Sequence, residues 1–196
     1  MNLIRKEIVN KILEGDKTSF EYVYRYYYPR LVHFTNQYLN DKETSNNIVQ
    51  DVFTELWDNK EKLLPDTNLT AWLFTVAKNK SLKVIARITT QQRYYHHIQS
   101  RQLSANYKAL TDFDTSDSLF EELEYLINAA LKKLPPTCKK VFEMSRFEDR
   151  KNREIAEELK LSIKTVEAHL TKALKALKAE LRDYLPLVFI LFYFHK

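Results

Sequence analysis

The chain contains a single glycine, Gly15, and only five prolines among 196 residues. Tight turns between β-strands need residues that tolerate positive φ, and glycine does so most readily. A fold built from hairpins therefore has too few turn residues here, whereas helices joined by short loops need few of them. The same shortage excludes a glycine-rich phosphate-binding loop of the Walker or dinucleotide type. The sequence predicts an all-α protein.

Cysteine and histidine usage indicates neither a disulfide nor a metal site. Cys138 is the only cysteine, and we interpret it as a small apolar residue within a helix. His96 and His97 are adjacent, but no cysteine or carboxylate lies at ligand spacing around them, so we expect no metal and no cofactor. The first residues carry scattered charges and no long apolar run, which is untypical of a signal peptide. We expect a cytoplasmic protein.

Positive charge is concentrated in two parts of a chain whose net charge is +5. No acidic residue lies between Asp66 and Asp112, whereas seven lysines and arginines fall in that stretch. The segment 151–182 holds eight basic residues against five acidic ones. Because lysine and arginine bind phosphates, two separated basic segments predict two contacts with one polyanion. A solvated surface with unbalanced charge is the alternative for either segment alone.

The first long helix is indicated by residues 20–34, where apolar and aromatic side chains recur at spacings of three and four. Thr18 and Glu21 match a capping box at its start, and Gly15 is typical of the end of the preceding helix. The run Tyr26–Tyr28 then forms part of a helix face, and core packing is favoured over a stacking platform for bases.

Two more helices complete a first domain over residues 1–90. One is expected to open near Lys42 and to continue to Trp57, and another follows the Pro65 break from Leu69 to about Ile88. The second of these alternates apolar residues with lysine and arginine. We therefore expect one compact bundle of three or four helices.

Helical periodicity is lost between residues 91 and 118, a polar stretch rich in glutamine and serine. We interpret this stretch as a flexible linker, extended or only partly helical. Periodicity returns in residues 119–184, where Pro135 and Pro136 end one helix and Thr137 is positioned to cap the next. The expected architecture is two small helical domains joined by a flexible linker.

Residues 152–177 predict a helix-turn-helix. Ile155 and Leu159 give the first helix an apolar face, and the small Ala156 lies where two helices must approach closely. Ser162 is a good N-cap for the second helix. In such a motif the second helix lies in the major groove of DNA, with its N-terminal half against base edges. An ordinary helical hairpin is the alternative.

The order of these motifs resembles that of a sigma-70-type RNA polymerase sigma factor, in the short form of the extracytoplasmic-function group. The motifs are IVQDVFTELW, AWLFTVAKNKSLKVIAR and, after the linker, LPPTCKKVFEMSRFEDRKNREIAEELKLSIKTVEAHLTKALKAL. The tyrosine-rich first helix is similar to members common in Bacteroides-like bacteria. The resemblance implies that residues 1–90 are sigma region 2 and that residues 119–184 are sigma region 4. It also implies two partners, core RNA polymerase and promoter DNA.

In this family the first domain binds the polymerase clamp through the helix that corresponds to residues 45–58. The periodicity agrees only in part, because Phe53 and Leu56 are equally compatible with the core. The resemblance assigns core-polymerase contacts to Gln50, Asp51, Phe53, Glu55, Leu56 and Trp57.

The family opens and reads the promoter −10 element with the segment that matches residues 71–87. Trp72 aligns with an aromatic residue near the melted strand, although it could equally be a core residue. Asn79 lies where the family receives a flipped base. Stacking surfaces and cations along the backbone suit a separated strand. The resemblance assigns −10 contacts to Trp72, Lys78, Asn79, Lys80, Lys83 and Arg87.

The family reads the −35 element with the second helix of the helix-turn-helix. Many members have arginine where this chain has Glu167 and His169, so the preferred element is expected to differ. Glu167 would repel phosphate and could accept a hydrogen bond from cytosine N4. The candidate −35 contacts are Arg153, Lys164, Thr165, Glu167, Ala168, His169, Lys172 and Lys175.

Two rival functions remain at this point. A stand-alone helix-turn-helix regulator would bind its operator without polymerase, whereas a protein-binding scaffold leaves both basic segments unexplained. An enzyme is least favoured, because no nucleophile–base pair or carboxylate pair stands out, and no small-molecule substrate is indicated.

The chain ends in an apolar tail, residues 185–196. Its apolar run is shorter than the roughly 20 residues that span a bilayer. We expect the tail to pack on the second domain or to be covered by a partner such as an anti-sigma factor, with membrane-surface contact less favoured.

Overall fold

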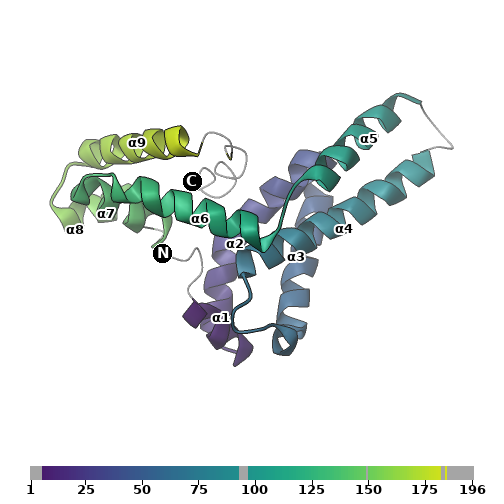
Figure 1. Cartoon of the computed structure of the whole chain (residues 1–196), viewed down its shortest axis with the longest axis horizontal. Coiled ribbons are helices and arrows are strands. Elements are labelled where there is room, and N and C mark those ends of the chain that lie inside the picture. The colour runs from purple at the N-terminus through teal and green to yellow at the C-terminus, as the bar shows by residue number, and fades with distance from the viewer. Residues whose placement is uncertain (1–5, 93–96, 149, 182–183, 185–196) are drawn as a thin grey trace. The chain divides into compact units, whose positions relative to one another are not determined.

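The computed structural model describes residues 6–92, 97–148, 150–181 and 184 (Figure 1). In those residues it contains nine α-helices, one 3₁₀ helix and no strand, so the all-α prediction is confirmed. None of the described helices is long and apolar enough to cross a membrane. The chain divides into two compact units, Met1–Phe120 and Glu121–Lys196. The predictions for the tail, residues 185–196, lie outside the described residues.

The first helix, α1 (Lys6–Leu13), is followed after one residue by Gly15, the only glycine of the chain. Gly15 has a φ of 83°, and its N–H donates to the carbonyl of Ile12 at 2.9 Å. A side chain would strain that left-handed backbone, so glycine is the residue that fits there. The helix-end role predicted for Gly15 is confirmed.

Helix α2 (Lys17–Leu39) is capped by Asp16. The Asp16 carboxylate accepts hydrogen bonds from the backbone N–H groups of Thr18 and Ser19. The capping box predicted from Thr18 and Glu21 is therefore wrong. Thr18 already lies in the first turn of the helix, and Asp16, two residues earlier, has the extended backbone that an N-cap requires.

Helix α3 (Lys42–Asp58) begins at the predicted residue. Its cap is Asp41, whose carboxylate accepts from the N–H groups of Glu43 and Thr44 at 3.0 and 3.2 Å. Asn40, in the left-handed region at φ 50°, reverses the chain between α2 and α3. Asparagine tolerates this conformation better than most residues, so the turn does not need a glycine. A short 3₁₀ helix, η1 (Lys60–Lys62), follows α3.

Helices α2, α3 and α4 (Leu69–Gln92) pack against one another around the core of the first unit. Tyr26 and Tyr27 are buried, and the Tyr27 hydroxyl lies 2.6 Å from that of Thr70 in α4. Core packing of the tyrosine run, as predicted, is thus confirmed for these two residues. The fully buried side chains of this core include Val23, Tyr27, Leu31, Phe34, Val49, Val52, Leu56, Leu73, Phe74 and Ile85.

Most of the segment interpreted as a linker belongs to this unit. Residues 97–112 form α5 (His97–Asp112), which runs antiparallel to α4 and packs on α2 and α4 (Figure 1). Leu110 is fully buried, and the Phe113 ring lies 5.2 Å from that of Phe34. Between residues 91 and 118 the structure is partly helical, as one form of the prediction allowed, but α5 packs within the first unit and does not form a flexible linker.

Polar contacts hold α5 in place, and such contacts cannot be predicted from the spacing of apolar residues. The Asn106 amide donates to the carbonyl of Tyr38, near the end of α2, at 2.7 Å. The Lys78 ammonium donates to the carbonyls of Thr111 and Phe113, where α5 ends. Such bonds satisfy carbonyls that a helix leaves without an internal partner. This stretch therefore has a polar composition although it is packed.

The second unit contains α6 (Asp117–Lys132) from Glu121 onward, followed by α7 (Pro136–Arg146), α8 (Asn152–Leu159) and α9 (Ile163–Glu180). Helix α7 packs against both α8 and α9, and α8 packs against α9. The predicted cap at Thr137 is wrong, because α7 already begins at Pro136. Proline suits the first helical position, where its φ is preset and its missing N–H costs no hydrogen bond.

Candidate functional site

The predicted helix-turn-helix is present as α8, a short turn and α9. Ser162 caps α9 as expected, and its hydroxyl accepts from the N–H of Thr165 at 3.0 Å. Ile155 is fully buried and Ala156 is 6% exposed, so α8 turns its apolar face inward. The turn contains Lys160 in the left-handed conformation, at φ 53°. Glycine is usual at that position, and lysine adopts it here in a chain that has almost no glycine.

One side of α9 faces inward and the other is exposed. Its buried residues are Val166, Leu170, Ala173 and Leu177. Thr165 and His169 are half-buried, and the carbonyl of His169 accepts a hydrogen bond from the Cys138 thiol. The pKa of that thiol is raised by burial. The exposed residues among the −35 candidates on α9 are Lys164, Glu167, Ala168, Lys172 and Lys175.

Arginines on both sides of the start of α8 have different surroundings. Arg153, a −35 candidate, is 81% exposed and pairs with Glu157 one turn later at 3.0 Å. Such an exposed pair contributes little to stability and leaves the guanidinium free to exchange partners. Arg150, which the sequence analysis did not single out, contacts Glu154 and Glu158 of α8. Arg150 therefore holds the segment that leads into the helix-turn-helix.

The −10 candidates all lie on α4, but their surroundings are not equivalent. Asn79, Lys83 and Arg87 are exposed, as a base- or phosphate-binding residue must be, and Trp72 is half-buried. Lys78 is bonded to the carbonyls at the end of α5. The role of Lys78 at the DNA backbone stays a prediction, and a phosphate would have to share or replace the partners that its ammonium has within the first unit.

Two of the predicted polymerase contacts are core residues. Phe53 is 2% exposed and Leu56 is fully buried between α3 and its neighbours. Leu56 offers no surface to a partner, so its assignment is corrected. Phe53 lines the pocket between α2 and α3, so its assignment stays a prediction. Apolar periodicity alone left this choice open, and packing resolves it for Leu56. The remaining candidates on α3 are Gln50 and Asp51, which are exposed, and Glu55 and Trp57, which are half-buried.

Glu55 and Lys80 were assigned to different surfaces, one to polymerase and the other to DNA. In the structure they form an ion pair between α3 and α4, with 2.9 Å from carboxylate oxygen to ammonium nitrogen. The sequence gives no sign of this pair, because the two residues are 25 positions apart and each lies in its own motif.

A pocket of about 530 Å³ opens between α2 and α3 beside the candidate polymerase contacts. The Trp57 ring forms part of its wall. The centroids of the Trp57 and Phe20 rings are 4.9 Å apart in an edge-to-face arrangement, and the Lys60 ammonium lies 4.7 Å from the Trp57 centroid. Apolar spacing predicted a helix face over residues 20–34 but could not indicate that part of this face is open. The pocket is lined by Lys17, Phe20, Tyr24, Gln50, Phe53, Thr54, Trp57 and Asp58.

Among the described residues there is no group of three histidine, cysteine or acidic side chains that could hold a metal ion. His96 lies outside the described residues, and His97 is described only as the first residue of α5. The candidate surfaces are a cationic helix face on α9, a partly cationic face on α4, and a pocket with a polar rim between α2 and α3.

Comparison with known proteins gives matches in both units. Residues 23–93 match sigma-70 region 2, and residues 125–177 match sigma-70, region 4. The chain is 21% identical over 192 residues to the ECF RNA polymerase sigma factor SigW of Bacillus subtilis (strain 168), across 93% of this chain and 100% of that protein. A solved structure of CnrH in complex with the cytosolic domain of CnrY covers 91% of this chain and 97% of its own, at 18% identity and a TM-score of 0.37.

Proposed function

Because the chain belongs to the sigma-70 family of RNA polymerase sigma factors, in its extracytoplasmic-function form, we propose which of its surfaces carry out promoter recognition. A member of this family binds core RNA polymerase and directs it to promoters, with region 2 at the −10 element and region 4 at the −35 element. The observation that carries the function is the order of the two matched regions, the second of which contains the helix-turn-helix.

The −35 reader that we propose is the exposed side of α9. Lys164 and Ala168 lie in its N-terminal half, where a recognition helix meets base edges, and Lys172 and Lys175 lie further along for phosphates. Thr165 has less freedom than the sequence implied, because its hydroxyl lies 2.8 Å from that of its capping residue, Ser162. Exposed Glu167 introduces a negative charge into this cationic side and is our candidate for discrimination between bases.

The −10 reader that we propose is the exposed side of α4, with Asn79 as the base contact and Lys83 and Arg87 along the phosphates. Binding to the single strand is what melts the duplex, since a ligand shifts an equilibrium only by its preference between two states. Trp72 is half-buried, so we propose that its accessible part contacts a base of the opened strand.

The polymerase-binding surface that we propose is the exposed side of α3 together with the pocket. Gln50 and Trp57 belong to both, which supports one continuous contact. The apolar walls suit a bulky apolar side chain of the polymerase, and Lys17 and Asp58 provide a polar rim.

A Thr54→Trp variant tests the pocket, because a bulky ring at that position fills it. Thr54 is exposed and its hydroxyl donates to the carbonyl four residues earlier, at 3.0 Å. Thr111 of α5 has the same exposure and the same bond, at 2.8 Å, so Thr111→Trp is the matched control. Thr54→Trp should weaken binding to purified core polymerase at least tenfold and Thr111→Trp should not. Equal effects would contradict the pocket as the contact.

Promoter-directed transcription is the decisive test of the function. The purified chain should support initiation by core polymerase on a promoter library and should bind promoter duplex tightly only when core is present. Tight, specific duplex binding by the chain alone would instead favour the stand-alone regulator. We propose that the chain carries out no chemistry itself and that it acts in the cytoplasm, where polymerase and promoters are located.

An anti-sigma factor is a further partner that we propose. The sequence predicts that the apolar tail, residues 185–196, is covered either by the second domain or by such a partner. Deletion of residues 186–196 should change solubility or inhibitor binding. If neither property changed, the tail would have no such role.

A further inference from the structure

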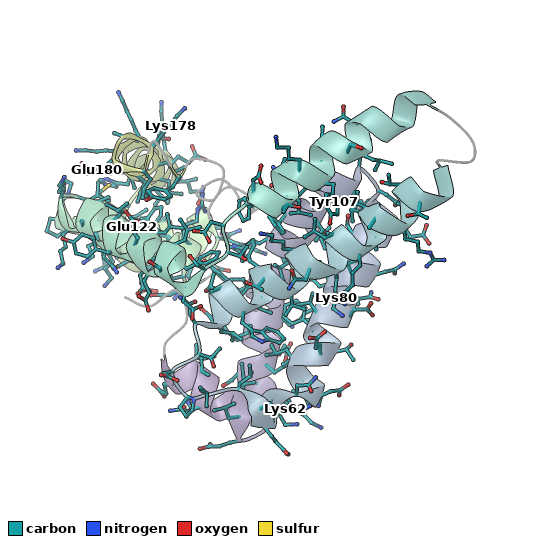
Figure 2. The ribbon with its side chains drawn as sticks, turned by 45° about the vertical axis from the view of Figure 1, so that its right-hand side comes forward. Lys62, Lys80, Tyr107, Glu122, Lys178 and Glu180 are labelled. Carbon is teal, nitrogen blue, oxygen red and sulfur yellow. The ribbon has the colours of Figure 1, made fainter. Side chains whose placement is uncertain are left out.

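The ion pair between Glu55 and Lys80 joins the two helices that carry the polymerase and −10 surfaces. Figure 2 labels Lys80 on α4. The side chains of Glu55 and Lys80 are 41% and 26% exposed, so the pair is partly covered yet reachable from solvent. Within the described part of the first unit, the other ion pairs link residues one turn apart on a single helix. The pair is therefore a tertiary contact that lies between two functional surfaces.

The pair changes the charge that α4 presents. Of its four cations assigned to the −10 element, Lys78 is bonded to carbonyls and Lys80 is neutralised by Glu55. Lys83 and Arg87 are exposed and take part in no ion pair with another described residue. Lys78 keeps its charge, because carbonyls are neutral, but its ammonium already has partners. Two of the four cations, Lys83 and Arg87, are thus left without a described partner.

A DNA phosphate and the Glu55 carboxylate compete for the Lys80 ammonium, because both are negatively charged. A phosphate that approaches Lys80 meets the Glu55 carboxylate at nearly the same distance, so attraction and repulsion largely cancel. A cationic group that binds Glu55 removes this repulsion and leaves the Lys80 ammonium available. The partner that engages α3 can therefore raise the affinity of α4 for nucleic acid without any change in the fold.

We propose that the Glu55–Lys80 pair couples polymerase binding to −10 recognition: a cationic side chain of core polymerase takes over Glu55, and Lys80 then binds a phosphate of the opened strand. This inference rests on the proposed function of both surfaces. Because such coupling is reciprocal, the opened strand strengthens polymerase binding by the same factor.

The test begins with the full chain alone and a labelled, mixed-sequence single-stranded oligonucleotide, measured by fluorescence anisotropy across a range of salt concentrations. Glu55→Gln should bind several-fold more tightly at low salt. Its plot of log affinity against log salt should steepen by about 0.7, the value for one additional phosphate contact on a single strand. Asp51→Asn is the matched control, since it removes the same charge one turn earlier on the same exposed helix. It should change the affinity less and leave the slope unaltered.

The tighter oligonucleotide binding expected for Glu55→Gln must depend on Lys80. Lys80→Gln should have little effect in the wild type, where Glu55 already neutralises the lysine, and should abolish the gain in the Glu55→Gln background. Gains that are equal for Glu55→Gln and Asp51→Asn, or that survive Lys80→Gln, would overturn the proposal. Tryptophan fluorescence during urea unfolding checks that each variant is folded.

Coupling itself is measured with core polymerase. The factor by which core raises affinity for the oligonucleotide should be smaller for Glu55→Gln than for the wild type, because Lys80 is already free. An equal factor refutes the coupling. Absence of promoter-directed transcription by the wild type refutes the proposed function instead, and the oligonucleotide series without polymerase remains informative in that case.

Discussion

Leu110→Ala is the substitution that tests most directly whether α5 belongs to the first unit. Leu110 is fully buried, and burial of that side chain depends on the packing of α5 against α2 and α4. Leucine-to-alanine changes at buried positions cost about 2–5 kcal/mol through lost transfer energy and a residual cavity. With a urea dependence of about 2 kcal/mol per molar, the unfolding midpoint should fall by about 1–2.5 M.

The measurement can be confined to this unit, because both tryptophans, Trp57 and Trp72, lie within residues 1–120. Tryptophan fluorescence during urea unfolding therefore reports the first unit without a contribution from the second. Leu64→Ala is the matched control, since Leu64 is 65% exposed and the change in side-chain volume is the same. If the midpoint of Leu110→Ala moved no further than that of Leu64→Ala, residues 97–112 would not pack as α5 does in the structure.

Three further predictions concern the DNA surfaces and a helix cap. Asn79→Ala should weaken initiation on duplex promoters more than on pre-melted ones in a run-off assay, and equal losses would contradict base capture at this residue. His169→Ala should change the preference at one or two −35 positions in a promoter-library selection, by about 1–3 kcal/mol per position, whereas a uniform loss would indicate a phosphate contact. Hydrogen bonds from Thr44 hold the pKa of Asp41 below its usual value. Because the folded pKa is lower than the unfolded one of about 3.9, the cap stabilises α3 above about pH 4 and less as pH falls through the folded value. Asp41→Ala should therefore lower the urea midpoint more at neutral pH than in acid, and Asp41→Asn should retain a cap that does not titrate. A difference between wild type and Asp41→Ala that is equally large at pH 7 and pH 2 would contradict this explanation.

The helices and the helix-turn-helix were predictable because their determinants are local. The start of α3 at Lys42, the end of α1 shortly before Gly15 and the Ser162 cap of α9 each depend on residues within a few positions. Two caps were predicted wrongly for a reason that is also local. Asp16 and Pro135 each lie two residues before the predicted caps, Thr18 and Thr137, and the sequence does not say which of several neighbouring residues has the non-helical backbone.

The packing of α5 was not predictable in the same way, because it depends on partners far along the chain. Two polar contacts hold it. The Asn106 amide of α5 donates to the Tyr38 carbonyl, and the Lys78 ammonium of α4 donates to two carbonyls at the end of α5. Neither contact leaves a pattern in the composition of residues 91–118, which is polar like that of a loop. Hydrophobic periodicity detects recurring buried apolar side chains, and Leu110 is the only buried residue in the part of α5 whose burial is described, residues 102–112.

Charge pairing is likewise not predictable from the sequence, and it affects how strongly each of the two proposed DNA surfaces binds. Counting cations along the sequence treats Lys78, Lys80, Lys83 and Arg87 as equals, yet the structure leaves only the last two without a described partner. On α9, by contrast, Lys164, Lys172 and Lys175 are exposed and lie in no ion pair with another described residue. Affinity for phosphates scales with the cations that are free to bind them. The chain alone should therefore hold DNA mainly through α9, and the −10 surface should reach its full charge only when a partner displaces Lys80 from Glu55.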